Sequence, residues 1–205
     1  FLPPSYTYRH PLKHCSVTMG YIFDPEVLQQ VAKDAIGQKK PRKEMFQIIA
    51  NQLAKKYPGH IGTEPDWLFN NAGGAMGTMW ILHASITEYV IIFGSVTGTE
   101  GHSGRFFATD YFVILDGEQW CAKATDLEKQ VYKPGDMNIM PAGTATQYRM
   151  PDTCFALEYA RGFIPAMLPF GVADTLFSTL DFHTLVKTFY IYGKCTVKEL
   201  LQLKI

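Results

Sequence analysis

Apolar residues recur at helical spacing in two segments of the first third of the chain. The first segment begins at Asp24, which can cap a helix ahead of Pro25, and its apolar positions continue to Gly37. The second runs from about Arg42 to Lys56 and ends before a Pro-Gly pair. The pattern therefore predicts two amphipathic helices at the start of the folded part.

From Trp67 onward the pattern changes to short β-branched or aromatic runs separated by turn clusters such as those at 98–101, 134–136 and 141–143. Six or seven short strands with evenly spaced turns indicate a β-sandwich or β-barrel. The expected strands are Thr78–Ser85, Thr87–Gly94, Arg105–Leu115, Gln130–Tyr132, Met137–Met140, Ala145–Met150 and Cys154–Ala160.

Two helical segments are expected after the last strand. Ile164–Ser178 is apolar nearly all round, with Asp174 as its only charge, and Ser178 to Asp181 resembles a capping box that opens a final helix. Such helices either cover the core or lie in a membrane interface, and their terminal position favours the interface. The final helix has apolar residues Phe182, Leu185, Val186, Phe189 and Val197, which alternate with His183, Lys187, Lys194 and Lys198.

Length and composition fit one folded unit of 205 residues, which we divide into a lead-in with helices (1–66), a ligand domain (67–162) and terminal helices (163–205). Residues 1–20 are proline-rich and are expected to be extended. Nineteen basic residues balance nineteen acidic ones, so no nucleic-acid partner is expected and the ligand should be neutral or only weakly charged. Because the sequence begins with Phe, we expect a preceding segment with room for an anchor.

No metal site or organic cofactor is expected. The four cysteines lie far apart without a C-x-x-C pair, and the six histidines are scattered. The glycine-rich stretch 71–77 lacks the order of a phosphate loop and is expected to be a tight turn. The stretch Gly135–Thr146 resembles the second motif of cupin barrels, but Thr146 stands where a metal-binding histidine would be. His83 and Glu88 match the first cupin motif poorly, because its H-x-H pair is missing.

Two carboxyl groups fall within apolar strands. Glu158 lies inside the run FALEYA, and Asp110 lies inside FFATDYFVIL. An ionised carboxylate there costs several kcal/mol unless it is paired or protonated. Either group could instead point outward, and Glu158 could pair with Arg161. Alternation places Phe106, Asp110 and Phe112 on one strand face, with Phe107, Tyr111 and Val113 on the other.

Long segments of the chain resemble the family that unites fungal C-8 sterol isomerases with the sigma-1 receptor. They are FNNAGGAMGTMWILHASITEYVIIFG, TEGHSGR, DGEQW, EYARGFIP and ADTLFSTLDF. The resemblance implies a cupin-like β-barrel, two C-terminal membrane-facing helices, a homotrimer, and an endoplasmic reticulum anchor in a preceding segment. Glu158 falls on the pocket glutamate of the family. The receptor's pocket aspartate falls on Phe112, and Asp110 stands two residues earlier on the same strand face.

The isomerases move a sterol ring double bond from C8 to C7 by protonation at C9 and loss of a C7 proton. We expect Glu158 and Asp110 to carry this chemistry as the catalytic pair, with His102 as an undecided participant. Glu88 lies on the strand face opposite Tyr89 and is expected to brace the fold outside the pocket. The alternative is a non-catalytic protein that binds hydrophobic amines or sterols and regulates partners. The expected substrate-binding residues are Met79, Tyr89, Ile91, Phe93, Phe106, Phe112, Met150 and Met167.

Overall fold

The computed structural model describes residues 20–204; the predicted lead-in up to residue 19, and Cys15 within it, lie outside this range. The two N-terminal helices are confirmed as α1 (Pro25–Gly37) and α2 (Arg42–Lys56). Asp24 caps α1, because its Oδ1 atom accepts hydrogen bonds from the backbone of Glu26 (2.8 Å) and Val27 (3.3 Å). The helix boundaries are therefore set by the expected capping and proline signals.

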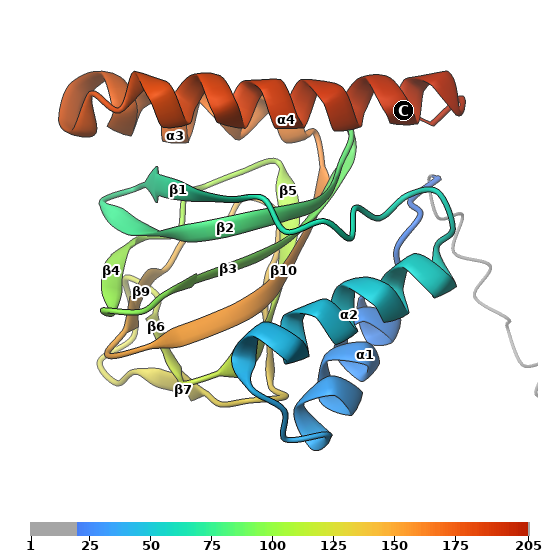
Figure 1. Ribbon diagram of the computed structural model, residues 1–205. Helices are drawn as coiled ribbons and strands as arrows, with labels where there is room; N and C mark the ends of the chain where they lie inside the picture. Colours follow the sequence, from blue (N-terminus) through green and yellow to red (C-terminus); the bar gives the residue numbers. More distant parts are fainter. Residues whose placement is uncertain (1–19, 205) are drawn as a thin grey trace, which may run out of the picture.

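Within residues 20–204, ten strands form two antiparallel sheets that face each other (Figure 1). The larger sheet has the order β1-β2-β3-β10-β5-β8 and the smaller has the order β4-β9-β6-β7. The strands are β1 (Trp67–Ala72), β2 (Ala75–Ala84), β3 (Glu88–Ser95), β4 (Thr99–His102), β5 (Ala108–Asp116), β6 (Gln119–Ala122), β7 (Gln130–Tyr132), β8 (Met137–Met140), β9 (Gln147–Met150) and β10 (Cys154–Gly162).

The expected fold class, mostly β with flanking helices, is confirmed, and all seven predicted strands are present. Within residues 20–204, the hydrogen-bonded strands do not close into one continuous barrel, because they separate into two sheets. The glycine-rich stretch is the predicted tight turn: Gly73 and Gly74 both have positive φ (64° and 82°) between paired β1 and β2.

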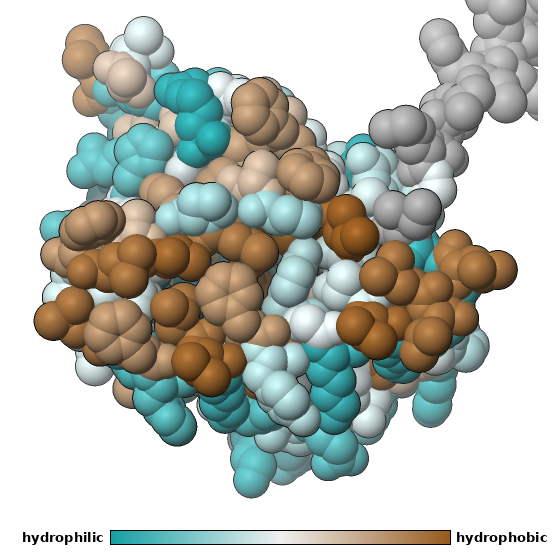
Figure 2. Space-filling view, turned by 90° about the horizontal axis from the view of Figure 1, so that it is seen from above, coloured by the Kyte–Doolittle hydropathy of each residue, from teal (hydrophilic) through white to brown (hydrophobic). Residues whose placement is uncertain are grey.

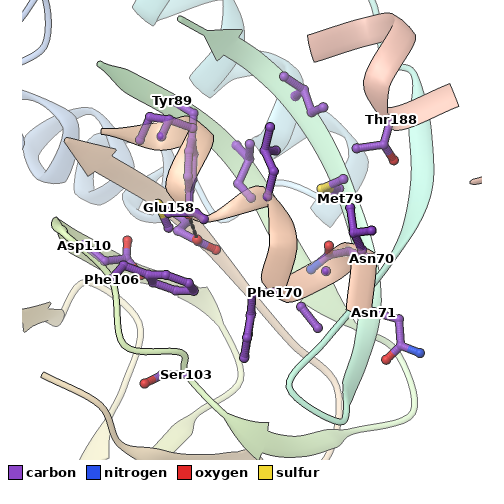
Figure 3. A pocket seen from close by; sticks show the side chains of 18 of the residues that line it. Asn70, Asn71, Met79, Tyr89, Ser103, Phe106, Asp110, Glu158, Phe170 and Thr188 are labelled. Atoms are coloured by element: carbon purple, nitrogen blue, oxygen red, sulfur yellow. Dashed lines mark hydrogen bonds between the residues drawn. The ribbon is translucent and has the colours of Figure 1, made fainter. Parts of the chain in front are cut away.

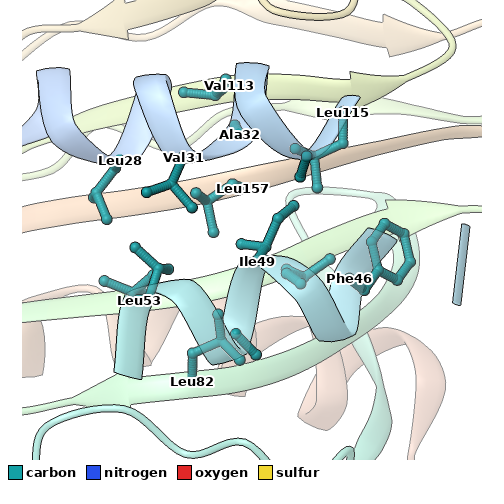
Figure 4. Close-up of a cluster of buried hydrophobic side chains, with 14 of the residues drawn as sticks. Leu28, Val31, Ala32, Phe46, Ile49, Leu53, Leu82, Val113, Leu115 and Leu157 are labelled. Carbon is teal, nitrogen blue, oxygen red and sulfur yellow. The ribbon is translucent and has the colours of Figure 1, made fainter. Parts of the chain in front are cut away.

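The main core lies between the N-terminal helices and the outer face of the larger sheet (Figures 1 and 4). Strand alternation decides which side chains enter it. Val113 and Leu115 of β5 pack toward α1 and α2, while Phe112 and Ile114 belong to a second cluster on the inner face. Two buried faces on one sheet explain why the central strands are so apolar.

The C-terminal segment consists of a short 3-10 turn (Ile164–Ala166), α3 (Leu168–Asp174), a π-helical turn (Thr175–Thr179) and α4 (Phe182–Leu201). The expected single helix over 164–178 is therefore broken into shorter pieces. The expected capping box at Ser178 is wrong: Asp181 caps α4, accepting from the backbone of Thr184 (3.0 Å), and Leu180 before it has a left-handed φ of 54°.

Helices α3 and α4 lie together across the open end of the two sheets (Figure 1). Viewed from that side, apolar residues gather over the outer surface (Figure 2). Phe177 is 87% exposed and Val186 is 69% exposed. Within residues 20–204, no helix has the length and apolar character that crossing a membrane requires.

Candidate functional site

A cavity of about 240 Å³ lies between the two sheets and beneath α3 and α4 (Figure 3). Inner-face residues of β2, β3, β5 and β10 form one wall, residues of β6 and β9 form part of another, and α4 contributes Leu185 and Phe189. Most of this lining is apolar, and Glu158 and Asp110 are its carboxylic acids.

Glu158 projects into the cavity from the centre of β10. Its neighbours Leu157 and Tyr159 pack into the core on the helix side, so alternation turns Glu158 to the inner face. Its Oε1 atom accepts a hydrogen bond of 2.5 Å from the Tyr89 hydroxyl of β3. Burial raises the pKa of Glu158 to about 7, because the charged form is poorly solvated there.

Asp110 lies on the neighbouring strand, where it pairs with Ala160, while Glu158 pairs with Phe112. The two carboxyl groups are therefore diagonal neighbours on one sheet face (Figure 3). The Oδ1 atom of Asp110 is buried without a hydrogen-bond partner among residues 20–204. Burial first, and the charge of Glu158 second, hold the pKa of Asp110 well above its usual range. The charge of one group therefore disfavours ionisation of the other.

The alternative positions considered for these carboxyl groups are not found. The Arg161 guanidinium lies over the Tyr111 ring, 5.0 Å from its centroid, and forms no ion pair with Glu158. Glu88 lies outside the cavity, as expected, and braces the fold: it accepts hydrogen bonds from the backbone of Ile22 (2.7 Å) and from the Tyr159 hydroxyl (2.9 Å).

The expected substrate-binding residues separate into two groups. The structure places Phe93 and Met150 in the packed cluster beside the cavity rather than on its wall. His102 is on the wall, where its Nδ1 atom accepts a hydrogen bond from Gly104 (2.9 Å). The residues found on the wall are Met79, Tyr89, Ile91, Phe106, Phe112 and Met167.

Sequence reasoning missed the part of the wall formed by the smaller sheet. Gln119 and Cys121 of β6 and Tyr148 of β9 line the cavity. The signal in β6 is weak, since four residues alternate only twice between buried and half-buried positions. Thr146, at the place of the absent cupin histidine, also lines the cavity, and its hydroxyl contacts the Met140 sulfur (3.6 Å).

Two histidines that are distant in sequence, His60 and His83, lie close together outside the cavity. The expectation of scattered histidines is therefore wrong for this pair. His60 Nδ1 lies 2.7 Å from Glu199 Oε2, and His83 Nδ1 lies 3.7 Å from Glu199 Oε1. Their ligand atoms lie within 4.8 Å of one another, a spacing that could hold a metal ion. However, His83 Nδ1 already bonds the His60 carbonyl (2.9 Å). The cluster therefore fits an internal anchor for α4 better than a metal centre.

A family model described as "ERG2 and Sigma1 receptor like protein" matches residues 6–204. The chain belongs to this family. The match spans both sheets, the cavity and the terminal helices, so it covers every element that builds the site.

The relatives of the chain fall into two groups. A C-8 sterol isomerase of Neurospora crassa is 50% identical over 89% of this chain and 72% of its own length, and one of Aspergillus fumigatus is 50% identical over 90% and 78%. A sigma non-opioid intracellular receptor 1 of Danio rerio is 41% identical over 92% of this chain and 85% of its own.

Among solved structures, an RmlC-like cupin from Shewanella frigidimarina matches with a TM-score of 0.40 and 15% identity. It covers 49% of this chain and 86% of that chain.

Proposed function

We propose that this protein is a sterol isomerase that moves a ring double bond from C8 to C7. The observation that carries the proposal is the pair of carboxyl groups, Glu158 and Asp110, whose pKa values are raised in an apolar cavity. An alkene is a very weak base, so its protonation needs a neutral carboxylic acid held away from water. The similarity to fungal C-8 sterol isomerases supports the same activity.

In the proposed reaction, the protonated carboxyl group gives its proton to C9. The electron pair of the C8–C9 double bond forms the new C–H bond, which leaves a tertiary cation at C8. The second carboxylate then takes a proton from C7, and the electron pair of that bond closes the C7–C8 double bond. The proton that was added and the proton that was removed balance, so the reaction consumes no co-reactant.

The surroundings of the pair suit a cationic intermediate. The negative charge of Glu158 and Asp110 stabilises the cation in a cavity whose lining is mostly apolar. The rings of Tyr89 and Phe112 lie on the same wall and add attraction between a cation and an aromatic face. The Tyr89 hydroxyl, bonded to Glu158, keeps this carboxyl group pointing into the cavity.

The remaining expectations from the family extend this proposal. We place the exposed apolar surface of α3 and α4 in the interface of the endoplasmic reticulum membrane, from which a sterol would enter beneath the helices. We also propose that the native assembly is a homotrimer and that neither metal nor organic cofactor takes part. The exposed apolar side chains support the membrane contact most directly.

Substitution of the carboxyl groups tests the proposal. Glu158→Gln keeps the size and a hydrogen-bonding head but cannot carry the proton, so conversion of a Δ8 sterol should fall about 10²- to 10⁴-fold. The conversion rate of Asp110→Asn should fall by a similar factor. The double variant should be only slightly slower than either single variant, because the two groups act as a unit. Glu128→Gln, at an exposed position, is the matched control. Folded Glu158→Gln protein with normal turnover would refute the proposal.

A second candidate function is that of a non-catalytic receptor, as the name of the sigma receptor relative suggests, and we propose hydrophobic amines as its ligands. An ammonium group would take the place of the cation beside the two carboxyl groups. Both functions require the carboxyl pair, so amine binding does not separate them. A wild-type protein that binds such an amine through Glu158 but leaves a Δ8 sterol unchanged would favour the binding protein.

A further inference from the structure

Polar side chains gather on the part of the cavity wall that the smaller sheet provides. Gln119 and Cys121 of β6 share a strand face, and Tyr148 of β9 pairs directly with Cys121. All three line the cavity, and Gln119 is only 3% exposed. In a cavity whose lining is mostly apolar, these three residues form a polar end.

The hydrogen bonds of this polar end are incomplete. Asn138 of β8 donates from Nδ2 to Gln119 Oε1 and to Cys121 Sγ, both at 3.2 Å. This bond orients the Gln119 carboxamide, yet its Nε2 group has no partner among residues 20–204, and neither has the Tyr148 hydroxyl. Both residues line the cavity with unused hydrogen-bonding capacity, so a polar atom of a ligand can pair with them.

The position of the polar end relative to the carboxyl pair follows from the strand register. Glu158 of β10 pairs with Phe112 of β5, which pairs with Asn138 of β8. Two strand spacings, about 10 Å, therefore separate the backbones of Glu158 and Asn138. A sterol is a rigid plate with its reacting bond in the middle, a hydroxyl group at one end and an alkyl tail at the other. A polar anchor two strands from the acid suits the hydroxyl end.

We infer that Gln119 and Tyr148 bind the 3-hydroxyl group of the sterol, an inference that rests on the proposed sterol function. Gln119 Nε2 donates to the sterol oxygen, and the sterol hydroxyl donates to the Tyr148 hydroxyl oxygen. The alkyl tail then extends toward the apolar residues of the terminal helices, such as Leu185 and Phe189. The sterol enters with its hydroxyl group first and leaves its tail nearest α4.

Equilibrium binding of two unreactive ligands tests this orientation: a fully saturated 3β-hydroxy sterol and its 3-deoxy counterpart. The measured quantity is the ratio of their dissociation constants, which cancels the shared apolar contacts. Tyr148→Phe and Gln119→Met should each shift this ratio about 3- to 10-fold against the hydroxy sterol. Tyr132→Phe, whose hydroxyl bonds Gln130 away from the cavity, should leave it unchanged.

Equal weakening of both ligands, or an unchanged ratio in both variants, would overturn the inference. Because neither ligand can be isomerised, the result does not depend on turnover. A protein that shows the shift but fails to isomerise a Δ8 sterol would retain the hydroxyl site and contradict the proposed reaction. A protein that isomerises the sterol but shows no shift in the ratio would support the proposed reaction and contradict the hydroxyl site.

Discussion

At the scale of single residues, the site depends on two acids that the fold places where charge is poorly tolerated. Glu158 and Asp110 lie on adjacent central strands, each facing the cavity, and Asp110 has one oxygen without a partner. Burying a carboxyl group this way costs folding free energy, and natural proteins keep such costs mainly at functional sites. Tyr89 offsets part of this cost through its bond to Glu158.

This cost predicts a specific dependence of stability on pH. The pKa of Glu158 rises from its ordinary 4.5 to about 7 through burial, so the folded protein keeps a proton that the unfolded chain releases between these values. The free energy of unfolding should therefore fall as the pH rises through this window. Glu158→Gln removes this loss and should be more stable than the wild type by up to a few kcal/mol at pH 8, and by much less at pH 4. Denaturant unfolding at both values measures the difference, and a gap that does not change with pH would contradict the prediction.

At the scale of secondary structure, the C-terminal end of α4 is anchored by buried charges. Glu199 is 2% exposed and binds His60, and Lys204 just beyond the helix lies 3.2 Å from the buried Glu88. With the Glu199–His83 contact of 3.7 Å, these contacts join the C-terminal end of α4 to the segment before β1, to β2 and to β3. The C-terminal end of α4 is thus held in a fixed position over the sheets.

Weakening this anchor should loosen α4 before it unfolds the sheets. Glu199→Gln keeps the shape but loses the charge-assisted bond to His60, so the protein should lose about 1–3 kcal/mol of stability. Amide hydrogen exchange should accelerate most in the last turns of α4. Glu64→Gln, at an exposed position, is the matched control. Unchanged exchange in α4 would show that the cluster does not hold the helix.

The sequence predicted elements well where local signals are strong. A capping aspartate, a following proline and regular apolar spacing determined α1, and α2 was predicted with its observed ends. Strands β1, β4 and β6 were missed because each is short or carries Asn, Gly or Glu, and is held by pairing with a distant partner. The division of 164–178 into a 3-10 turn, α3 and a π-helical turn was missed, because apolar composition alone does not show where the hydrogen-bond pattern of a helix changes.

At the scale of the whole molecule, the cavity depends on segments that are far apart in the chain. Alternation predicted which face of β5 and β10 carries the acids, since that signal is local. It could not predict that β6 and β9 would face them, because the packing of one sheet on another is not encoded in any single segment. The part of the cavity wall that contains Gln119 and Tyr148 was therefore missed, whereas the mostly apolar part that contains Glu158 was predicted.

The terminal helices expose an apolar surface that we place in a membrane interface. The protein should therefore bind phospholipid vesicles, and the double variant Val186→Asp, Phe177→Asp should bind them at least about 10-fold more weakly. Leu127→Asp is the matched control, because Leu127 is fully exposed but lies between β6 and β7, away from these helices. Vesicle flotation measures the effect. Equal loss in the control, or none in the double variant, would contradict the membrane contact.

The most direct test of the central claim is isomerisation of a Δ8 sterol in deuterium oxide. Protonation by an acid that exchanges with solvent should place one deuterium at C9 of the Δ7 product, which mass spectrometry and nuclear magnetic resonance can locate. The wild-type protein should form this labelled product, and Glu158→Gln should form at least about 10²-fold less of it. Absence of Δ7 product, or Δ7 product without deuterium at C9, would contradict acid–base catalysis by the buried carboxyl pair.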